Sequence, residues 1–186
     1  MHILCIEVWT NMKKKLLLLT FILGSLITFS QKSINSDYSA KELIKVGKMI
    51  IKDGGICSLI TIDKEGIARA RAMDGFAPEE DLTIWFGTHS QSRKVEQIKN
   101  NPKVSLYYLD KDNSGYVLIH GKAELINDLK TKKKYWKDHW DAYYPDTEKD
   151  YLLIKVTPIW MEVLSDKHGI KNDPKNWEVP RVDFQL

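Results

Sequence analysis

The chain has 186 residues, enough for a single domain with a substantial buried core. Its composition is that of a globular protein, with 43% hydrophobic and 28% charged residues, and its formal net charge is only +3. So small a charge, with no basic stripe, argues against a nucleic-acid-binding protein, and we interpret the lysine-rich run 130–134 as the solvated face of a helix.

The N-terminal region has the pattern of a secretory signal peptide. Lysines follow Met12, an apolar run covers Leu16–Ile27, and small residues precede Gln31, as they do at a cleavage site. We therefore expect residues 1–30 to be a signal peptide, with Met12 as a candidate true start, and residues 31–186 to form one domain that is periplasmic or secreted. An uncleaved membrane anchor is the alternative, although the apolar run is shorter than the roughly 20 residues that span a bilayer.

The next segments predict a helix and a β-hairpin. Ser39 and Glu42 form a capping box before an apolar stripe of helical spacing, which two glycines end at positions 54–55. A strand rich in β-branched residues, Ile56–Ile62, is joined by a turn to a second strand, Ile67–Met73. The second strand alternates, so one of its faces carries only alanines and the other carries both arginines.

Further strands and helices complete the pattern. The expected strands are Leu82–Phe86, Val104–Leu109, Tyr116–Ile126 and Tyr151–Leu164, the last with a bulge or kink at Pro158. The expected helices are Ser90–Asn100 and Asp128–Pro145, and the tail after Asp166 is expected to be irregular. Short antiparallel connections and few helices indicate an α+β protein, which we interpret as a six-stranded antiparallel barrel with helices at its edges.

The segment between residues 82 and 102 is arranged like an anion-binding site. Its strand runs into a helix whose first amides have no internal partner and whose dipole is positive at this end. Ser90, Ser92, Arg93 and Lys94 lie at that helix start. Because cations are normally disfavoured there, the pattern predicts a bound anion such as a phosphate. The alternative is that both cations simply face the solvent.

Several stretches of the sequence, taken together, resemble the FMN-binding split barrels related to pyridoxamine 5′-phosphate oxidase, and most of all their small general stress protein branch. The stretches are Arg71–Met73, Trp85–Thr88, Ser92–Val95, Asn101–Leu106 and Val117–Ala123, within a resemblance that covers about Ser39–Leu164. The resemblance implies an α+β fold, a six-stranded antiparallel split β-barrel with flanking helices, in which FMN lies at the interface of a homodimer.

The resemblance also implies a set of cofactor-binding residues, namely Arg71, Ala72, Met73, Thr88, Ser92, Arg93, Lys94 and Trp160. Arg71 matches an arginine near the flavin phosphate or ring, and the set from Thr88 to Lys94 matches the segment that binds the phosphate and ribityl groups. Ala72 replaces a proline of the family pattern, Met73 would present its backbone to the flavin ring, and Trp160 would approach it across the dimer. Charge-assisted contacts from arginine and lysine suit a phosphate dianion, which agrees with the local pattern.

Each of these roles has an alternative. Arg71 pairs with a carboxylate of segment 79–81 in one alternative, and Trp85 and Trp160 pack into the core in another. His89 is the histidine best placed to titrate near neutral pH, but no side chain stands out as a catalytic acid or base. The sequence has no metal-ligand spacing, and we expect no metal site. It also lacks the C-terminal substrate-binding motif of true pyridoxamine-phosphate oxidases, which argues against a vitamin B6 activity.

We therefore expect an exported FMN flavoprotein, an oxidoreductase that acts as a homodimer on an unidentified small molecule or electron donor. We expect neither a nucleic acid nor, after signal removal, a membrane as partner. One alternative is a flavin- or haem-binding module without turnover, with His89, His120 and His168 as candidate haem ligands. The other is a structural barrel whose site is vestigial.

Overall fold

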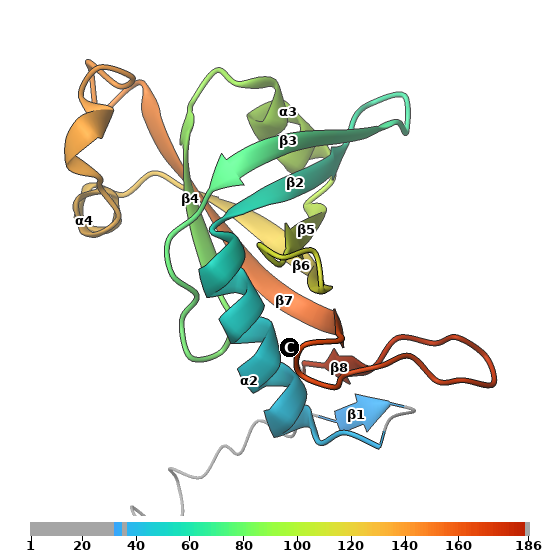
Figure 1. The fold of residues 1–186 in the computed structure, drawn as a ribbon. Coiled ribbons are helices and arrows are strands. Elements are labelled where there is room, and N and C mark those ends of the chain that lie inside the picture. The colour runs from blue at the N-terminus through green and yellow to red at the C-terminus, as the bar shows by residue number, and fades with distance from the viewer. Residues whose placement is uncertain (1–31, 35–36, 185–186) are drawn as a thin grey trace, which may run out of the picture. The chain divides into compact units, whose positions relative to one another are not determined.

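The computed structural model describes residues 32–34 and 37–184 (Figure 1). The predicted signal peptide, residues 1–30, lies outside this range. Among the helices of the described residues, none has both the length and the apolar character needed to cross a membrane.

The strands of the described residues join a single antiparallel sheet (Figure 1). They are β1 (Lys32–Ile34), β2 (Ile56–Ile62), β3 (Ala68–Asp74), β4 (Ile84–His89), β5 (Lys103–Leu109), β6 (Gly115–Ile126), β7 (Tyr151–Ser165) and β8 (Arg181–Asp183). The helices are α2 (Ala40–Gly54), α3 (Arg93–Asn100), α4 (Leu129–Lys134) and the 3₁₀ turn η1 (Asp138–Trp140). The α+β class and the six predicted strands are confirmed, and the short strands β1 and β8 are additional.

The sheet does not close into a complete barrel. Its order is β1-β8-β7-β6-β5-β2-β3, and β4 pairs with β7. At the end of this order, β3 does not pair with β4 along its length. Gly75, the residue after β3, forms an isolated bridge with Phe86 of β4. Arg71 on β3 and Thr88 on β4 therefore come from the two strands that border the split.

The strands alternate between a buried inner face and a partly exposed outer face. On β6, Val117 and Ile119 are fully buried, whereas Leu118 between them is partly exposed. Helix α2 packs Leu43 and Ile50 into the same core as the inner face. Each such buried side chain stabilises the fold by about 1.5–3 kcal/mol relative to an exposed position.

The beginnings of the first two helices show how well local capping signals work. The predicted capping residue Ser39 accepts a hydrogen bond from the Glu42 amide at 3.2 Å, and α2 follows directly. Helix α3 begins at Arg93, later than the predicted Ser90, because Ser92 is its N-cap. The shift of the helix start leaves both predicted cations in the first turn.

The predicted long helix over residues 128–145 is wrong. Helix α4 ends before Tyr135, whose ring stacks on Trp85 of β4 with 4.5 Å between centroids. The next residue, Trp136, packs edge-to-face against Tyr151 of β7 at 5.1 Å. In a continuous helix, the side chains of Tyr135 and Trp136 would point about 100° apart. Because the helix ends before them, both rings can pack into one aromatic cluster.

The last part of the chain confirms one prediction and corrects another. The predicted irregularity near Pro158 is confirmed, since His120 lies opposite Trp160 but Gly121 lies opposite Pro158. The prediction of an irregular tail is wrong at β8, which pairs with β7. Val182 in β8 is fully buried, and Phe184 after it packs against the same core, so apolar residues attach this mainly polar segment to the core.

Candidate functional site

The turn after β4 brings two hydroxyl groups and an ammonium group together. Thr88 is buried near the end of β4, and Lys94 Nζ donates to its Oγ1 at 3.0 Å. The same Oγ1 lies 3.0 Å from Ser92 Oγ. Ser92 is the N-cap residue of α3, yet its side chain forms no capping hydrogen bond. The positive end of α3 therefore lies beside a group of polar side chains that are suited to an anion.

A second cation comes from the opposite side of the split. Arg71 on β3 donates from Nη1 to Thr61 Oγ1 at 2.7 Å and from Nη2 to Gln97 Oε1 at 2.9 Å. Thr61 Oγ1 in turn donates to Gln97 Oε1 at 2.6 Å. Both acceptors of the guanidinium are neutral, so the structure does not support the alternative in which Arg71 pairs with a carboxylate of segment 79–81. We call Arg71, Thr88, Ser92 and Lys94 the anion cradle.

The pKa values of the cations in the anion cradle are lowered by burial and by neighbouring positive charges. Burial, and then the charge of Arg71, lower the pKa of Lys94. Burial, and then the charges of Arg93 and Arg69, lower the pKa of Arg71. Arg93 is exposed and forms no hydrogen bond or ion pair with any described residue. Positive charge is thus concentrated here. Among the described residues, no carboxylate forms an ion pair with Arg71, Arg93 or Lys94, and a bound dianion would supply that neutralisation.

The remaining predicted residues occupy different surroundings. Ala72 is exposed on β3, and Met73 beside it is buried in the core. Trp160 lies on β7 in a separate stack, with the His120 ring on one side at 5.2 Å and the Arg181 guanidinium over its ring at 4.7 Å. Within one chain, the structure therefore brings together the predicted residues from β3, β4 and α3, but it places Trp160 in another cluster.

Two polar residues of the site were missed by sequence reasoning. Thr61 and Gln97 hold the Arg71 guanidinium, and neither belongs to a recognisable motif. The available signal was weak: Gln97 lies one helical turn after Arg93, so both lie on the same side of α3. Only the fold shows that this side meets β2 and β3.

The histidines of interest lie outside the anion cradle. His89 Nε2 lies 3.7 Å from Asp150 Oδ1, and its ring packs near Tyr144. Burial, then the charges of Lys103 and Arg181, lower the pKa of His120, which favours the neutral form of this ring. Among the described residues, no group of three or more His, Cys, Asp or Glu side chains is arranged to hold a metal ion.

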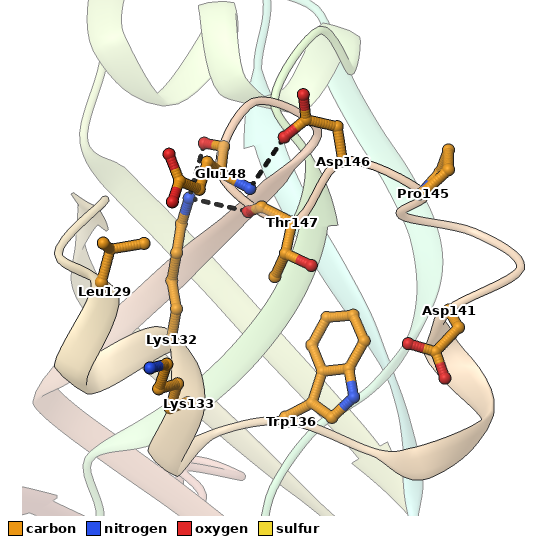
Figure 2. A pocket seen from close by; sticks show the side chains of 9 residues that line it. All are labelled: Leu129, Lys132, Lys133, Trp136, Asp141, Pro145, Asp146, Thr147 and Glu148. Atoms are coloured by element: carbon orange, nitrogen blue, oxygen red, sulfur yellow. Dashed lines mark hydrogen bonds between the residues drawn. The ribbon is translucent and has the colours of Figure 1, made fainter.

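A wider cleft, of about 690 Å³, lies in another part of the fold, between α4 and the segment before β7 (Figure 2). None of the predicted site residues lines it. Lys132 is almost fully buried there, and its ammonium donates to the carbonyl oxygens of Thr147 and Glu148 at 3.1 and 2.9 Å. The interpretation of run 130–134 as a wholly solvated face is therefore wrong at Lys132, which fastens the chain before β7 to α4.

The antiparallel sheet that stays open between β3 and β4 places this protein in the split-barrel class. The family model described as pyridoxamine 5′-phosphate oxidase like matches residues 41–169. The chain therefore belongs to the pyridoxamine 5′-phosphate oxidase-like family. The match includes every residue of the anion cradle.

Similar proteins come from several bacteria. General stress protein 26 of Bacillus subtilis (strain 168) is 31% identical over 100 residues, which are 52% of this chain and 69% of that protein. A related protein from Clostridium acetobutylicum has a solved structure that is 25% identical, with a TM-score of 0.60 over 69% of this chain and 92% of its own. General stress protein 26 from Bacillus anthracis (Sterne) is also 25% identical, with a TM-score of 0.55 over 67% of this chain and 92% of its own.

Proposed function

We propose that this protein is an FMN-binding flavoprotein that carries out redox chemistry on a small molecule. The observation that carries the proposal is the anion cradle. Lys94 donates to Thr88 Oγ1 beside Ser92 Oγ, and Arg71 donates to Thr61 and Gln97. Neither cation forms an ion pair with a carboxylate of the described residues. A phosphate monoester would accept from these donors and neutralise both cations. A structure of the same fold from Nostoc punctiforme PCC 73102, 15% identical, is described as an FMN-binding protein.

The residues present fit the cofactor at both of its ends. Lys94, Ser92 and Thr88 would bind the phosphate, and Arg71 would contribute a second charge. Ala68, Ala70 and Ala72, at alternate positions of β3, have small exposed side chains, which leave this face of the strand accessible to a flat ring. The bound isoalloxazine would supply hydride or electron transfer, while the protein anchors and orients it.

We further propose that the active form is a homodimer joined through the outer face of the sheet. This face carries partly exposed aromatic and apolar side chains, including the stacked pair Tyr107 and Tyr116 (5.3 Å) and Leu118. Trp160 lies on the same face, so a second copy would bring it towards the flavin of its partner. Arg181 and His120 cover its ring, so the indole would meet that flavin through its edge.

Export is proposed from the sequence pattern alone. A signal peptide over residues 1–30 would deliver the chain to the periplasm or the exterior, where it would take up its cofactor. Fractionation of cells that express the full chain, with a mass measurement of the recovered protein, tests this. Recovery of uncleaved protein from the cytoplasm would contradict it.

The binding site is tested with the double variant Arg93→Ala/Lys94→Ala. We expect the purified wild type to be yellow, with flavin absorption, and the double variant to lose FMN affinity by roughly a hundredfold, because charged hydrogen bonds contribute about 1.5–3 kcal/mol each. Lys99→Ala, which removes an exposed cation from the same helix, is the matched control and should retain FMN. Unchanged FMN retention in the double variant would refute the site.

A further inference from the structure

The cleft between α4 and the segment before β7 is large enough for a small ligand. Its volume is about 690 Å³, and small-molecule pockets occupy about 300–1,000 Å³. Half-buried Trp136 lines it, together with the apolar side chains of Leu129 and Pro145 (Figure 2). No residue of the anion cradle lines this cleft, so a ligand here would bind separately from the flavin.

Two opposite charges line this cleft without a partner. Lys133 and Asp141 are both exposed, and neither forms an ion pair or a side-chain hydrogen bond with any other residue of 32–34 and 37–184. Their side chains lie on opposite sides of the Trp136 ring in Figure 2. They therefore do not neutralise each other, and a ligand that carries both a positive and a negative group could pair with both.

The other charged groups of the lining already interact with one another or with neighbouring residues. Asp146 forms an ion pair with Lys149 at 3.0 Å and accepts a hydrogen bond from the Glu148 amide at 3.2 Å. Burial lowers the pKa of Lys132, and the charges of Glu148 and Asp146 oppose this effect. The Glu148 carboxylate thus offsets the charge of the Lys132 ammonium, which leaves one cation and one carboxylate for a ligand.

The buried ammonium of Lys132 also has an unused donor. A lysine ammonium has three N–H groups, and two of them donate to the carbonyl oxygens of Thr147 and Glu148. In the described part of the chain, no acceptor takes the third, although the side chain is almost fully buried. A buried donor without an acceptor is unfavourable, and a ligand carboxylate at the α4 side of the cleft would satisfy it.

We propose that this cleft binds a small zwitterion, namely a free amino acid or a short peptide with an apolar side chain. The carboxylate of the ligand pairs with Lys133 and accepts from the third N–H of Lys132. The ammonium of the ligand pairs with Asp141 and lies near the Trp136 ring, whose face attracts cations. The apolar side chain packs on the apolar part of the lining.

Isothermal titration of the purified protein with matched ligands tests the proposal. Phenylalanine carries both charges, whereas N-acetylphenylalanine lacks the ammonium and phenylalaninamide lacks the carboxylate. We expect phenylalanine to bind at least about fivefold more tightly than either analogue, because each analogue leaves one charged group of the cleft unpaired. The dipeptide alanyl-phenylalanine distinguishes the two sources: tighter binding than phenylalanine identifies a peptide site, and weaker binding identifies an amino-acid site.

Two variants test the roles of the opposite charges. Asp141→Asn should weaken the binding of phenylalanine and of phenylalaninamide by roughly fivefold and leave that of N-acetylphenylalanine unchanged, because only the first two carry an ammonium. Lys133→Ala should weaken phenylalanine and N-acetylphenylalanine and spare phenylalaninamide. Asp138→Asn and Lys130→Ala are the matched controls, since both residues are exposed nearby but lie outside the lining, and they should change no affinity.

Three results would overturn the proposal. One is equal affinity of the wild type for phenylalanine and its two analogues. Another is an equal loss of affinity for all three ligands in Asp141→Asn or Lys133→Ala, which would show that the residue only maintains the structure. The third is the absence of saturable binding of both phenylalanine and the dipeptide at millimolar concentrations.

Discussion

Arg71 shows how a cationic side chain is held in one orientation without being neutralised. Its two terminal nitrogens donate to Thr61 and Gln97, so its orientation is set while its charge remains available. A carboxylate in the place of Gln97 would hold the guanidinium equally well but would compete with the ligand. The sequence pointed to Arg71 but not to its acceptors, because one comes from a paired strand and the other from a helix.

The proposed binding of a phosphate should depend on pH through a single residue, Lys94. Because the pKa of Lys94 is lowered by burial and by Arg71, this lysine loses its charge at a lower pH than an ordinary lysine does. We expect FMN affinity, measured by fluorescence titration, to fall as the pH rises through this lowered pKa. It should also fall below about pH 6, where the phosphate dianion takes up a proton and becomes a monoanion.

Lys94→Arg separates the effect of this residue from that of other groups. A guanidinium stays charged throughout the range, so the loss of affinity at alkaline pH should disappear, and its persistence would show that another group is responsible. In the protein without ligand, Lys94 makes the stability of the fold depend on pH in the opposite direction. The folded state has the lower pKa and the unfolded state binds the proton more tightly, so the free energy of unfolding should rise with pH over this range.

At the scale of helices and strands, local sequence patterns predicted the elements that depend on local interactions. Helix α2 follows from its capping residue Ser39 and its apolar stripe, and the six long strands follow from their alternation and β-branched residues. The break after α4 could not be predicted, because it depends on Tyr135 meeting Trp85 from a distant strand. Strand β8 could not be predicted either, because its one buried residue, Val182, packs into a core that is formed by distant parts of the chain.

Gly87 connects β4 to the aromatic cluster. A Cβ at this position would overlap the rings of Trp140 and Tyr151, so only glycine lets them lie against the strand. We expect Gly87→Ala to lower the free energy of unfolding, measured by urea denaturation, by about 1–3 kcal/mol. In a Trp140→Leu background, Gly87→Ala should lower the free energy of unfolding by less, because the Trp140 ring that the new Cβ would overlap is absent. Equal costs in the two backgrounds would contradict this account of the glycine.

At the scale of the whole molecule, the single chain leaves an aromatic face of the sheet partly exposed. Tyr107, Leu118 and Trp160 lie on alternate positions of β5, β6 and β7, opposite in direction to the fully buried residues of the same strands. The anion cradle lies at the split between β3 and β4. A dimer through the sheet face would cover these side chains and would add a partner's residues to the flavin site.

This arrangement is tested by Leu118→Glu, which places a charge on the outer face of the sheet. We expect the wild type to be a dimer by light scattering and the variant to be a monomer with weakened FMN retention, because a dimer interface would bury the new carboxylate without a partner. Leu129→Glu is the matched control, since Leu129 is 49% exposed on α4, and it should remain dimeric. A monomeric wild type, or a dimeric Leu118→Glu protein, would contradict the proposed interface.

The central claim is that the anion cradle grips a phosphate, and the comparison of FMN with riboflavin tests it most directly, because the two ligands differ only in that group. Isothermal titration of apoprotein with each ligand gives the contribution of the phosphate. If Arg71 and Lys94 both bind it, FMN should bind at least about a hundredfold more tightly than riboflavin. Equal affinities for FMN and riboflavin would contradict the account.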